Sequence, residues 1–396
     1  MGNVHVWAPD LFSSTGGIQE FSRQLINAFY AGPFSLSLRR VVKNDMPGAA
    51  LDEPAMNNYS GYGHWPVKLR SPRFASECLR HVWRERPDLI ISTHLNFGPI
   101  ARIAQLSFGT PFVLVAHGVD AWQINNAARL KALQKANLTL AVSRYTRDRL
   151  INDAGLDTNR VRILPNTCDM DRFVIGPKPP RLLRKYGLQP QTPVILTVCR
   201  LDETEGYKGY DQIIKALPKI RREAPNTRYL IAGKGTDRPR IEKLAAETGV
   251  RDAVILAGYV PDDELTDYYN LCDIFAMPSK GEGFGIVYLE ALACGKPTLA
   301  GNMDGSRDAL ADGDLGLLVD PENMDEIASR IVSVLRREHT HPMLFNPQLL
   351  RQRVIELFGF ETFKHTVADL LEPFLRRNEA AVTRASDQRL GAIWRR

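Results

Sequence analysis

Two glutamates separated by seven residues carry the strongest chemical signal in the sequence. Glu282 and Glu290 bracket the stretch Gly-Phe-Gly-Ile-Val-Tyr-Leu. Gly283 and Gly285 leave this loop without side-chain bulk, so backbone N–H groups can approach a ligand closely. A helix that begins near Ile286 would aim its partly positive N-terminus at the same place. The pattern predicts a site for a diphosphate or for the hydroxyl oxygens of a sugar.

The spacing of the two glutamates excludes a shared acid–base pair. Along a continuous helix, eight residues span about 12 Å, which is too far for two carboxylates to act on one proton. They can instead hold two distant parts of one elongated ligand. From these residues alone a purely structural alternative stays open, in which Glu282 caps the helix and Glu290 lies on its solvated flank.

Two cations follow another predicted strand in the second half of the chain. Arg200 and Lys208 flank a glycine-containing loop after the apolar run Val194–Val198. Arginine supplies directional, often bidentate hydrogen bonds and lysine a mobile point charge, which together suit a diphosphate. The acidic segment Asp202–Glu205 is unusual beside such a site. Either it folds away, or it holds the two cations until a ligand arrives; a solvated charged loop is the structural alternative.

Weaker candidates lie at the ends of predicted strands in the first half. Gly16 and Gly17 stand between a strand and a helix, where a glycine pair permits close backbone approach to a phosphate. His117 follows the strand predicted over Phe112–Ala116, although a lone histidine is more often structural than functional. We assign the remaining candidates to an acceptor side, Asp120, Trp122, Ser143 and Arg144, or to a nucleotide pocket, Gly233 and Tyr259.

The elements that must position these residues alternate between short apolar runs and amphipathic helices. Strands are predicted in the first half over Val4–Ala8, Leu36–Val42, Leu89–Ser92, Phe112–Ala116, Leu138–Val142 and Val161–Leu164, and in the second half over Val194–Val198, Arg228–Ala232, Val254–Ala257, Ile274–Met277, Pro297–Ala300 and Leu315–Val319. This alternation predicts an α/β fold with two doubly wound, Rossmann-like parallel sheets. Ligands of such sheets bind beyond the carboxyl ends of the strands.

A proline-rich segment divides the two halves. Three of the five residues from Gly176 to Pro180 are proline, which interrupts helices and central strands. We therefore expect one domain over residues 1–176 and a second over residues 177–375, with residues 376–396 packed back on the first.

The composition is that of an ordinary globular protein. The 396 residues are 44% hydrophobic and 24% charged, enough for two cores of usual size. The net charge of +6 is small and scattered, which argues against nucleic-acid binding but allows contact with an anionic membrane. The five cysteines are widely spaced and fit a reducing cytoplasm. No cluster has metal-site spacing, so we expect no essential metal.

Taken together, the motifs resemble the donor-binding half of the family 4 retaining glycosyltransferases. The resemblance rests on Pro278-Ser279, Glu282-Gly-Phe-Gly, Glu290-Ala-Leu-Ala-Cys-Gly-Lys-Pro297 and Asp312-Gly-Asp-Leu-Gly-Leu-Leu-Val319. It covers nearly the whole chain and implies the GT-B fold, with an acceptor-binding N-terminal domain and a donor-binding C-terminal domain.

The resemblance also implies roles for individual residues. Glu282 contacts the hydroxyls of the donor sugar, Glu290 the ribose and His117 the donor sugar. Arg200 and Lys208 look like the family's diphosphate-binding pair. The implied donor-binding set is completed by Gly16, Gly17, Gly233, Tyr259, Gly283, Phe284, Gly285 and Ile286. The segment Gly301–Asp308 departs from the family's commoner Gly-Gly-x-Pro-Glu pattern close to the expected sugar pocket, where it can tune specificity.

The function implied is retaining, metal-independent and cofactor-free transfer of a hexose from a nucleoside diphosphate sugar to a glycan or lipid-linked acceptor. UDP-glucose or another UDP-hexose is favoured as the donor, with GDP-mannose next. The setting implied is bacterial exopolysaccharide or cell-envelope synthesis, in the cytoplasm or at the inner face of the membrane. A sugar-nucleotide epimerase of the same fold and a non-catalytic nucleotide-sugar-binding protein are the alternatives.

Overall fold

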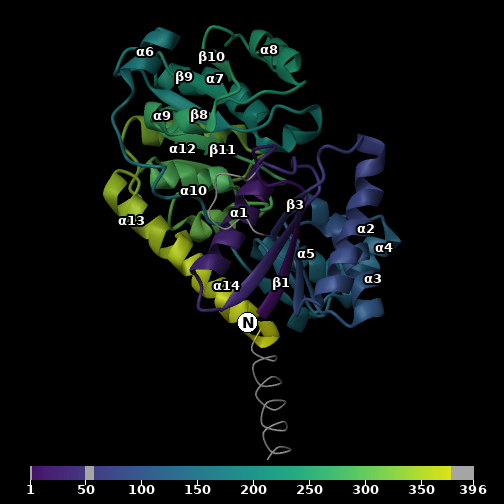
Figure 1. Cartoon of the computed structure of the whole chain (residues 1–396). Coiled ribbons are helices and arrows are strands. Elements are labelled where there is room, and N and C mark those ends of the chain that lie inside the picture. Colours follow the sequence, from purple (N-terminus) through teal and green to yellow (C-terminus); the bar gives the residue numbers. More distant parts are fainter. Residues whose placement is uncertain (1, 50–57, 376–396) are drawn as a thin grey trace, which may run out of the picture. The chain divides into compact units, whose positions relative to one another are not determined.

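The computed structural model describes residues 2–49 and 58–375, which divide into two compact units (Figure 1). Unit 1 contains the described residues up to Asn166 together with those from Glu361 to Leu375. Unit 2 is the continuous stretch Thr167–Phe360. The chain therefore leaves unit 1, builds unit 2 and then returns.

Unit 1 is built on a seven-stranded parallel sheet. Its strands, in the spatial order β3-β2-β1-β4-β5-β6-β7, are β3 (Tyr59–Gly61), β2 (Leu36–Val42), β1 (Gly2–Ala8), β4 (Leu89–Ser92), β5 (Phe112–Ala116), β6 (Leu138–Ala141) and β7 (Val161–Ile163). The residues of β4 and β5 are all buried, and β5 is a continuous apolar run, as expected for strands buried on both faces. The strand order reverses between β1 and β4, a place where α/β sheets bind ligands beyond their carboxyl ends.

Helices connect these strands and cover the sheet. They are α1 (Gly17–Ala31), α2 (Val67–Glu85), α3 (Gly98–Phe108), α4 (Ala127–Lys135), α5 (Arg144–Ala154) and α14 (Phe360–Leu375). Helix α14 is the part of unit 1 that returns after unit 2. The ring of its Phe363 meets that of Phe21 in α1 edge to face, with centroids 5.8 Å apart.

Unit 2 contains a six-stranded parallel sheet in the order β10-β9-β8-β11-β12-β13. Its strands are β8 (Val194–Val198), β9 (Arg228–Ala232), β10 (Val254–Gly258), β11 (Ile274–Met277), β12 (Thr298–Gly301) and β13 (Leu317–Val319). Its helices are α6 (Pro180–Tyr186), α7 (Tyr210–Glu223), α8 (Arg238–Glu247), α9 (Leu265–Leu271), α10 (Ile286–Ala293), α11 (Ser306–Ala309), α12 (Met324–Leu335) and α13 (Pro347–Phe358). The predicted α/β class, with two doubly wound parallel sheets, is confirmed.

The units divide ten residues before the predicted boundary at residue 176. The backbone N–H of Gly176 donates to Asn270 Oδ1 at 2.9 Å, and Asn270 Nδ2 donates to the carbonyl of Val174 at 3.0 Å. The segment 167–176 is thus fixed to α9 and belongs to unit 2. Helix α14 belongs to unit 1 rather than to the second domain. The expectation for residues 376–396 lies outside the described residues.

No helix within residues 2–49 and 58–375 combines the length and the apolar character needed to cross a membrane.

Candidate functional site

The structure brings Lys208 and Glu282 together at the carboxyl edge of the unit 2 sheet. Lys208 Nζ donates to Glu282 Oε2 at 2.6 Å, and each side chain is only 16% exposed. Burial alone would lower the pKa of Lys208, but the Glu282 carboxylate outweighs burial and raises it above its ordinary value. Lys208 therefore keeps its positive charge throughout the physiological range.

The N-terminus of α10 follows directly after Glu282. Gly285 precedes the helix with φ of 87°, and a Cβ on it would lie 2.4 Å from the ring of Tyr288, so only glycine fits this turn. Phe284 is buried, with its ring 5.6 Å from that of Phe358, and Ile286 is buried too. What this loop can offer a ligand is its backbone, since those two side chains anchor it in the core.

Glu290 is fixed on the same helix by a buried tyrosine. Tyr269 donates its hydroxyl to Glu290 Oε2 at 2.6 Å. Burial, reinforced by the Glu290 carboxylate, raises the pKa of Tyr269 well above its usual value. Glu290 is thus half-buried and held, in contrast to the solvated carboxylate of the structural alternative.

Arg200 is paired with the acidic segment that the sequence analysis found unusual. Its side chain is 78% exposed, and its guanidinium contacts the buried carboxylate of Glu205. The other oxygen of Glu205, Oε2, is buried without a hydrogen-bond partner in the described structure. The segment therefore holds one cation, Arg200, whereas Glu282 holds Lys208.

Two further candidates of unit 2 lie where neighbouring strands end. Gly233 follows β9, and its N–H donates to the carbonyl of Gly258 at 2.8 Å. Tyr259 follows β10 and is exposed, with Lys234 Nζ 4.8 Å from its ring centroid. Together with Arg200 and Glu282, these residues follow four strands of one sheet and share its carboxyl edge.

His117 follows β5 in unit 1 and is held as a neutral ring. Its Nε2 lies 2.9 Å from the carbonyl of Thr93, which can only accept, so the proton sits on Nε2. The ring meets that of Phe21 edge to face at 5.0 Å. Burial lowers the pKa of His117 to about 4. Its Nδ1 is therefore a fixed hydrogen-bond acceptor at neutral pH.

The acceptor-side candidates of unit 1 differ in how far their polar groups are already used within the protein. Asp120 Oδ1 accepts the backbone N–H of His117 at 3.0 Å, while its Oδ2 is buried without a hydrogen bond in the described structure. Trp122 packs edge to face on Tyr145 at 5.2 Å. Ser143 is buried and caps α5 by accepting the N–H of Thr146 at 3.0 Å, and Arg144 is exposed beside it. The Ser143 hydroxyl thus has a structural use.

The sequence analysis missed the residue that shapes the loop before Gly16 and Gly17. Buried Asp45, which follows β2, accepts three consecutive backbone N–H groups from residues 11–13 at 2.9, 3.1 and 3.0 Å. It also accepts the hydroxyl of Tyr59 at 2.8 Å. A carboxylate after a strand is a weak signal by itself, because the backbone N–H groups that it accepts lie more than 30 residues earlier.

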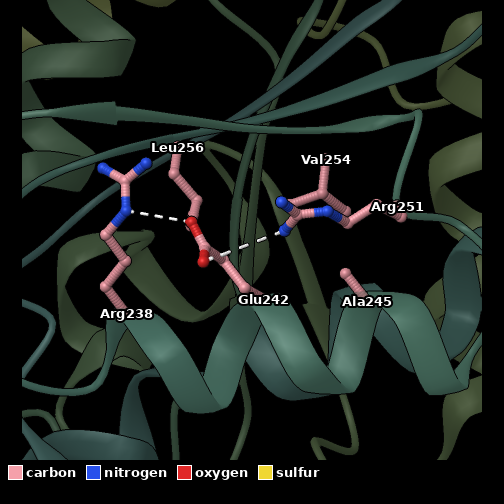
Figure 2. Close-up of a pocket in the computed structure, with 6 residues that line it drawn as sticks. All are labelled: Arg238, Glu242, Ala245, Arg251, Val254 and Leu256. Carbon is pink, nitrogen blue, oxygen red and sulfur yellow. Dashed lines mark hydrogen bonds and ion pairs between the residues drawn. The ribbon is translucent and has the colours of Figure 1, made fainter.

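A hollow elsewhere in unit 2 contains none of the predicted site residues. It lies between α8 and β10 and is lined by Arg238, Glu242, Ala245, Arg251, Val254 and Leu256 (Figure 2). Glu242 pairs with both arginines, at 3.0 and 4.0 Å. Both cations of this hollow thus share the carboxylate of Glu242. Among residues 2–49 and 58–375, no group of three histidine, cysteine or carboxylate side chains could hold a metal ion.

Comparison with known proteins assigns both halves of the chain. Residues 33–172 match the family described as Glycosyltransferase Family 4, and residues 180–346 match Glycosyl transferases group 1. One relative is a GDP-mannose-dependent alpha-(1-6)-phosphatidylinositol monomannoside mannosyltransferase of Mycolicibacterium smegmatis. It is 35% identical over 251 residues, which are 60% of this chain and 63% of the relative. The chain thus spans somewhat less than two thirds of that relative's length.

A second relative and two solved structures extend the comparison. A D-inositol 3-phosphate glycosyltransferase of Acidothermus cellulolyticus is 29% identical over 297 residues, 68% of this chain and 64% of the relative. HepE of Anabaena, solved with UDP and glucose, has a TM-score of 0.78 at 18% identity and covers 94% of this chain and 100% of its own. Sucrose-phosphate synthase of Thermosynechococcus elongatus has a TM-score of 0.78 at 21% identity, covering 96% and 100%. The chain has the GT-B fold, and it joins a domain that matches Glycosyltransferase Family 4 to a domain that matches Glycosyl transferases group 1.

Proposed function

We propose that the protein transfers a hexose from a nucleoside diphosphate sugar to a hydroxyl group, with retention of the anomeric configuration and without a metal ion. The observation that carries the proposal is the buried contact between Lys208 and Glu282, with Arg200 following the adjacent strand. A cation for a diphosphate and an acceptor for sugar hydroxyls then stand side by side, as a sugar nucleotide requires.

The hard step is departure of the diphosphate, as positive charge grows on the anomeric carbon. Lys208 and the N-terminus of α10 are fixed before the reaction, so they stabilise the growing negative charge without reorganising. Arg200 adds a mobile cation once it leaves Glu205. These groups supply the charge that a divalent cation supplies in other transferases, which supports a metal-independent reaction.

The two carboxylates contact different parts of the donor. Glu282 accepts hydroxyls of the sugar and Glu290 accepts those of the ribose. His117 is neutral at pH 7, so its Nδ1 accepts a hydrogen bond rather than donating one. Retention follows a front-face path, in which the leaving phosphate takes the proton of the acceptor hydroxyl as the new glycosidic bond forms.

For the donor we propose GDP-mannose ahead of UDP-glucose. The preference rests on the GDP-mannose-dependent relative, which is 35% identical over 251 residues, and it reverses the order that the sequence analysis favours. A UDP-hexose is the second candidate. The acceptor we propose is a lipid-linked glycan of a cell-envelope or exopolysaccharide pathway, because the same relative acts on a phosphatidylinositol monomannoside.

Exposed apolar and cationic side chains of α2 support peripheral contact with an anionic membrane. Val67, Leu69 and Trp83 are 78%, 53% and 58% exposed on this one helix. The helix carries five cations against two carboxylates, namely Lys68, Arg70, Arg73, Arg80 and Arg84 against Glu77 and Glu85. Apolar side chains beside a cationic excess suit the headgroup region of an anionic bilayer.

The catalytic proposal is tested in two stages. Thermal-shift measurements with GDP and UDP identify the nucleotide, and we expect GDP to give the larger shift. Hydrolysis or transfer of labelled GDP-mannose is then measured with EDTA present, and the one-bond carbon–proton coupling at the product's anomeric carbon reports the configuration. An inverted product or loss of activity in EDTA would refute retention or metal independence. Interconversion of sugar nucleotides would instead identify an epimerase, and binding without turnover a non-catalytic protein.

The membrane contact is tested by flotation with vesicles. The wild type should float with phosphatidylglycerol vesicles and remain behind with phosphatidylcholine. Leu69→Ser combined with Trp83→Ser should abolish flotation, whereas Ile355→Ser, at an exposed position of α13, should not. Equal flotation of both variants would rule out α2 as the contact.

A further inference from the structure

Asp304, in the segment that departs from the family's glycine pair, is buried with every hydrogen bond made inside unit 2. Its Oδ2 accepts the hydroxyl of Ser279 at 2.8 Å and the backbone N–H of Glu282 at 2.7 Å. Its Oδ1 accepts the backbone N–H of Ser306 at 3.0 Å and also the hydroxyl of Ser306. Both oxygens are therefore occupied, so the carboxylate has no acceptor position to offer a donor sugar.

Gly305, the residue after Asp304, fixes the backbone carbonyl of Glu282. The N–H of Gly305 donates to the carbonyl of Glu282 at 2.9 Å. A Cβ on Gly305 would lie 2.0 Å from the carbonyl oxygen of Gly283, so no side chain fits between these segments. Two consecutive residues after β12 thus hold the N–H and the C=O of Glu282.

We propose that Asp304 is a positioning residue for Glu282, an inference that rests on the function proposed above. The Glu282 carboxylate meets Lys208 at 2.6 Å, and it can do so only if its backbone stays in place. A glycine at position 304 could not accept the Glu282 N–H through a side chain. The departure from the family pattern therefore adds a carboxylate that accepts the backbone N–H of Glu282. Any effect of Asp304 on sugar specificity then arises from the position that it gives to the Glu282 side chain.

The first test is Asp304→Asn, which replaces an acceptor by an N–H donor facing backbone N–H groups. A displacement of the order of 1 Å at a reacting group can cost about 100-fold in rate. We expect turnover to fall between about 10- and 100-fold, while the Kd for free nucleotide stays within twofold. Asp273→Asn is the matched control, because Asp273 lies before β11 and accepts Lys178 and the N–H of Val194.

A double variant separates positioning from a general structural effect. If Asp304 acts through Glu282, adding Asp304→Asn to Glu282→Gln should lower turnover no further. Additive losses, or a parallel loss of nucleotide affinity, would overturn the inference. Should Asp304→Asn fail to fold, Ser279→Ala removes one of the hydrogen bonds to Asp304, together with the contact between the Ser279 and Tyr288 hydroxyls. It should lower turnover about threefold to tenfold by the same reasoning, with the nucleotide Kd unchanged.

Chemical labelling of Lys208 tests, without any assay of activity, whether Asp304 keeps Glu282 in contact with Lys208. Reductive methylation read by mass spectrometry should modify Lys208 slowly in the wild type and at least fivefold faster in Asp304→Asn. Wild-type labelling and wild-type turnover in this variant would refute the role of Asp304. Absence of nucleotide binding and turnover in the wild type would refute the proposed transferase instead, and the labelling result would still decide the role of Asp304.

Discussion

Replacing Lys208 by methionine should destabilise unit 2 far more than an ordinary surface substitution. The methionine keeps the apolar stem but leaves the Glu282 carboxylate without its cation. Removing one partner of a buried pair costs about 3–5 kcal/mol, because the remaining charge stays desolvated. Each side chain of this pair is 16% exposed, so we expect about 3 kcal/mol, the lower end of that range. With a urea dependence of about 3 kcal/mol per M, the midpoint of unit 2 should fall by about 1 M.

The tryptophans provide an internal control for this measurement. Of the five tryptophans, Trp7, Trp65, Trp83 and Trp122 lie in unit 1, and Trp394 lies outside the described residues. In a Trp394→Phe background the fluorescence therefore follows unit 1, whereas circular dichroism follows both units. The Lys208→Met variant should shift the dichroism transition and leave the fluorescence transition in place. Equal movement of both transitions would refute the assignment of the loss to unit 2.

A double variant separates stability from catalysis. Lys208→Met combined with Glu282→Gln removes both charges and should regain most of the lost stability. Its turnover should remain at least about 100-fold below the wild type, because a preorganised group at the leaving diphosphate is absent. Failure of the second substitution to restore any stability would refute the view that an uncompensated Glu282 causes the loss.

Three further predictions concern single groups. Burial lowers the pKa of both His5 and His117 to about 4, so the unfolded chain binds more protons between that value and about 6.5. The free energy of unfolding of unit 1 should therefore fall as pH drops below about 6.5, by about 3 kcal/mol per histidine at pH 4. His117→Gln should remove the contribution of one of the two histidines, so acid-denaturation curves of this variant should depend less steeply on pH. Arg200→Ala should lower turnover about 100-fold or more; near-normal turnover would exclude the clamp. Glu290→Gln should weaken binding of free nucleotide about tenfold in calorimetry, and unchanged affinity would exclude its ribose role.

The strands could be predicted because their apolar, β-branched runs are local. The predicted strands Leu36–Val42 and Phe112–Ala116 coincide with β2 and β5. Strand β3 was missed, since three residues are too few for a pattern. Helix α6 was also missed, because its first residue, Pro180, closes the run of prolines that indicated a linker, although proline is well suited to the first turn of a helix.

The residues of the site that could be predicted are likewise those whose signal is local in the sequence. The loop Glu282–Gly285 could be predicted because its glycines and glutamate are adjacent in sequence. Asp45 and Asp304 could not, since each becomes informative only when the fold brings backbone N–H groups of other segments to its carboxylate. The prediction for Ser143 shows the reverse case, in which a polar residue after a strand is used to begin a helix.

The return of the chain to unit 1 has a consequence for biosynthesis. Unit 2 is one continuous stretch and can complete its sheet as soon as Phe360 has left the ribosome. Unit 1 cannot, because α14 is made after all of unit 2 and supplies Phe363 against Phe21. While the nearly 200 residues of unit 2 are being synthesised, nascent unit 1 therefore lacks α14, and Phe21 of α1 lacks its contact with Phe363. A circular permutant that places α14 ahead of β1 would let unit 1 close first. Protease resistance of unit 1 in stalled nascent chains, compared between the permutant and the natural order, would measure the delay.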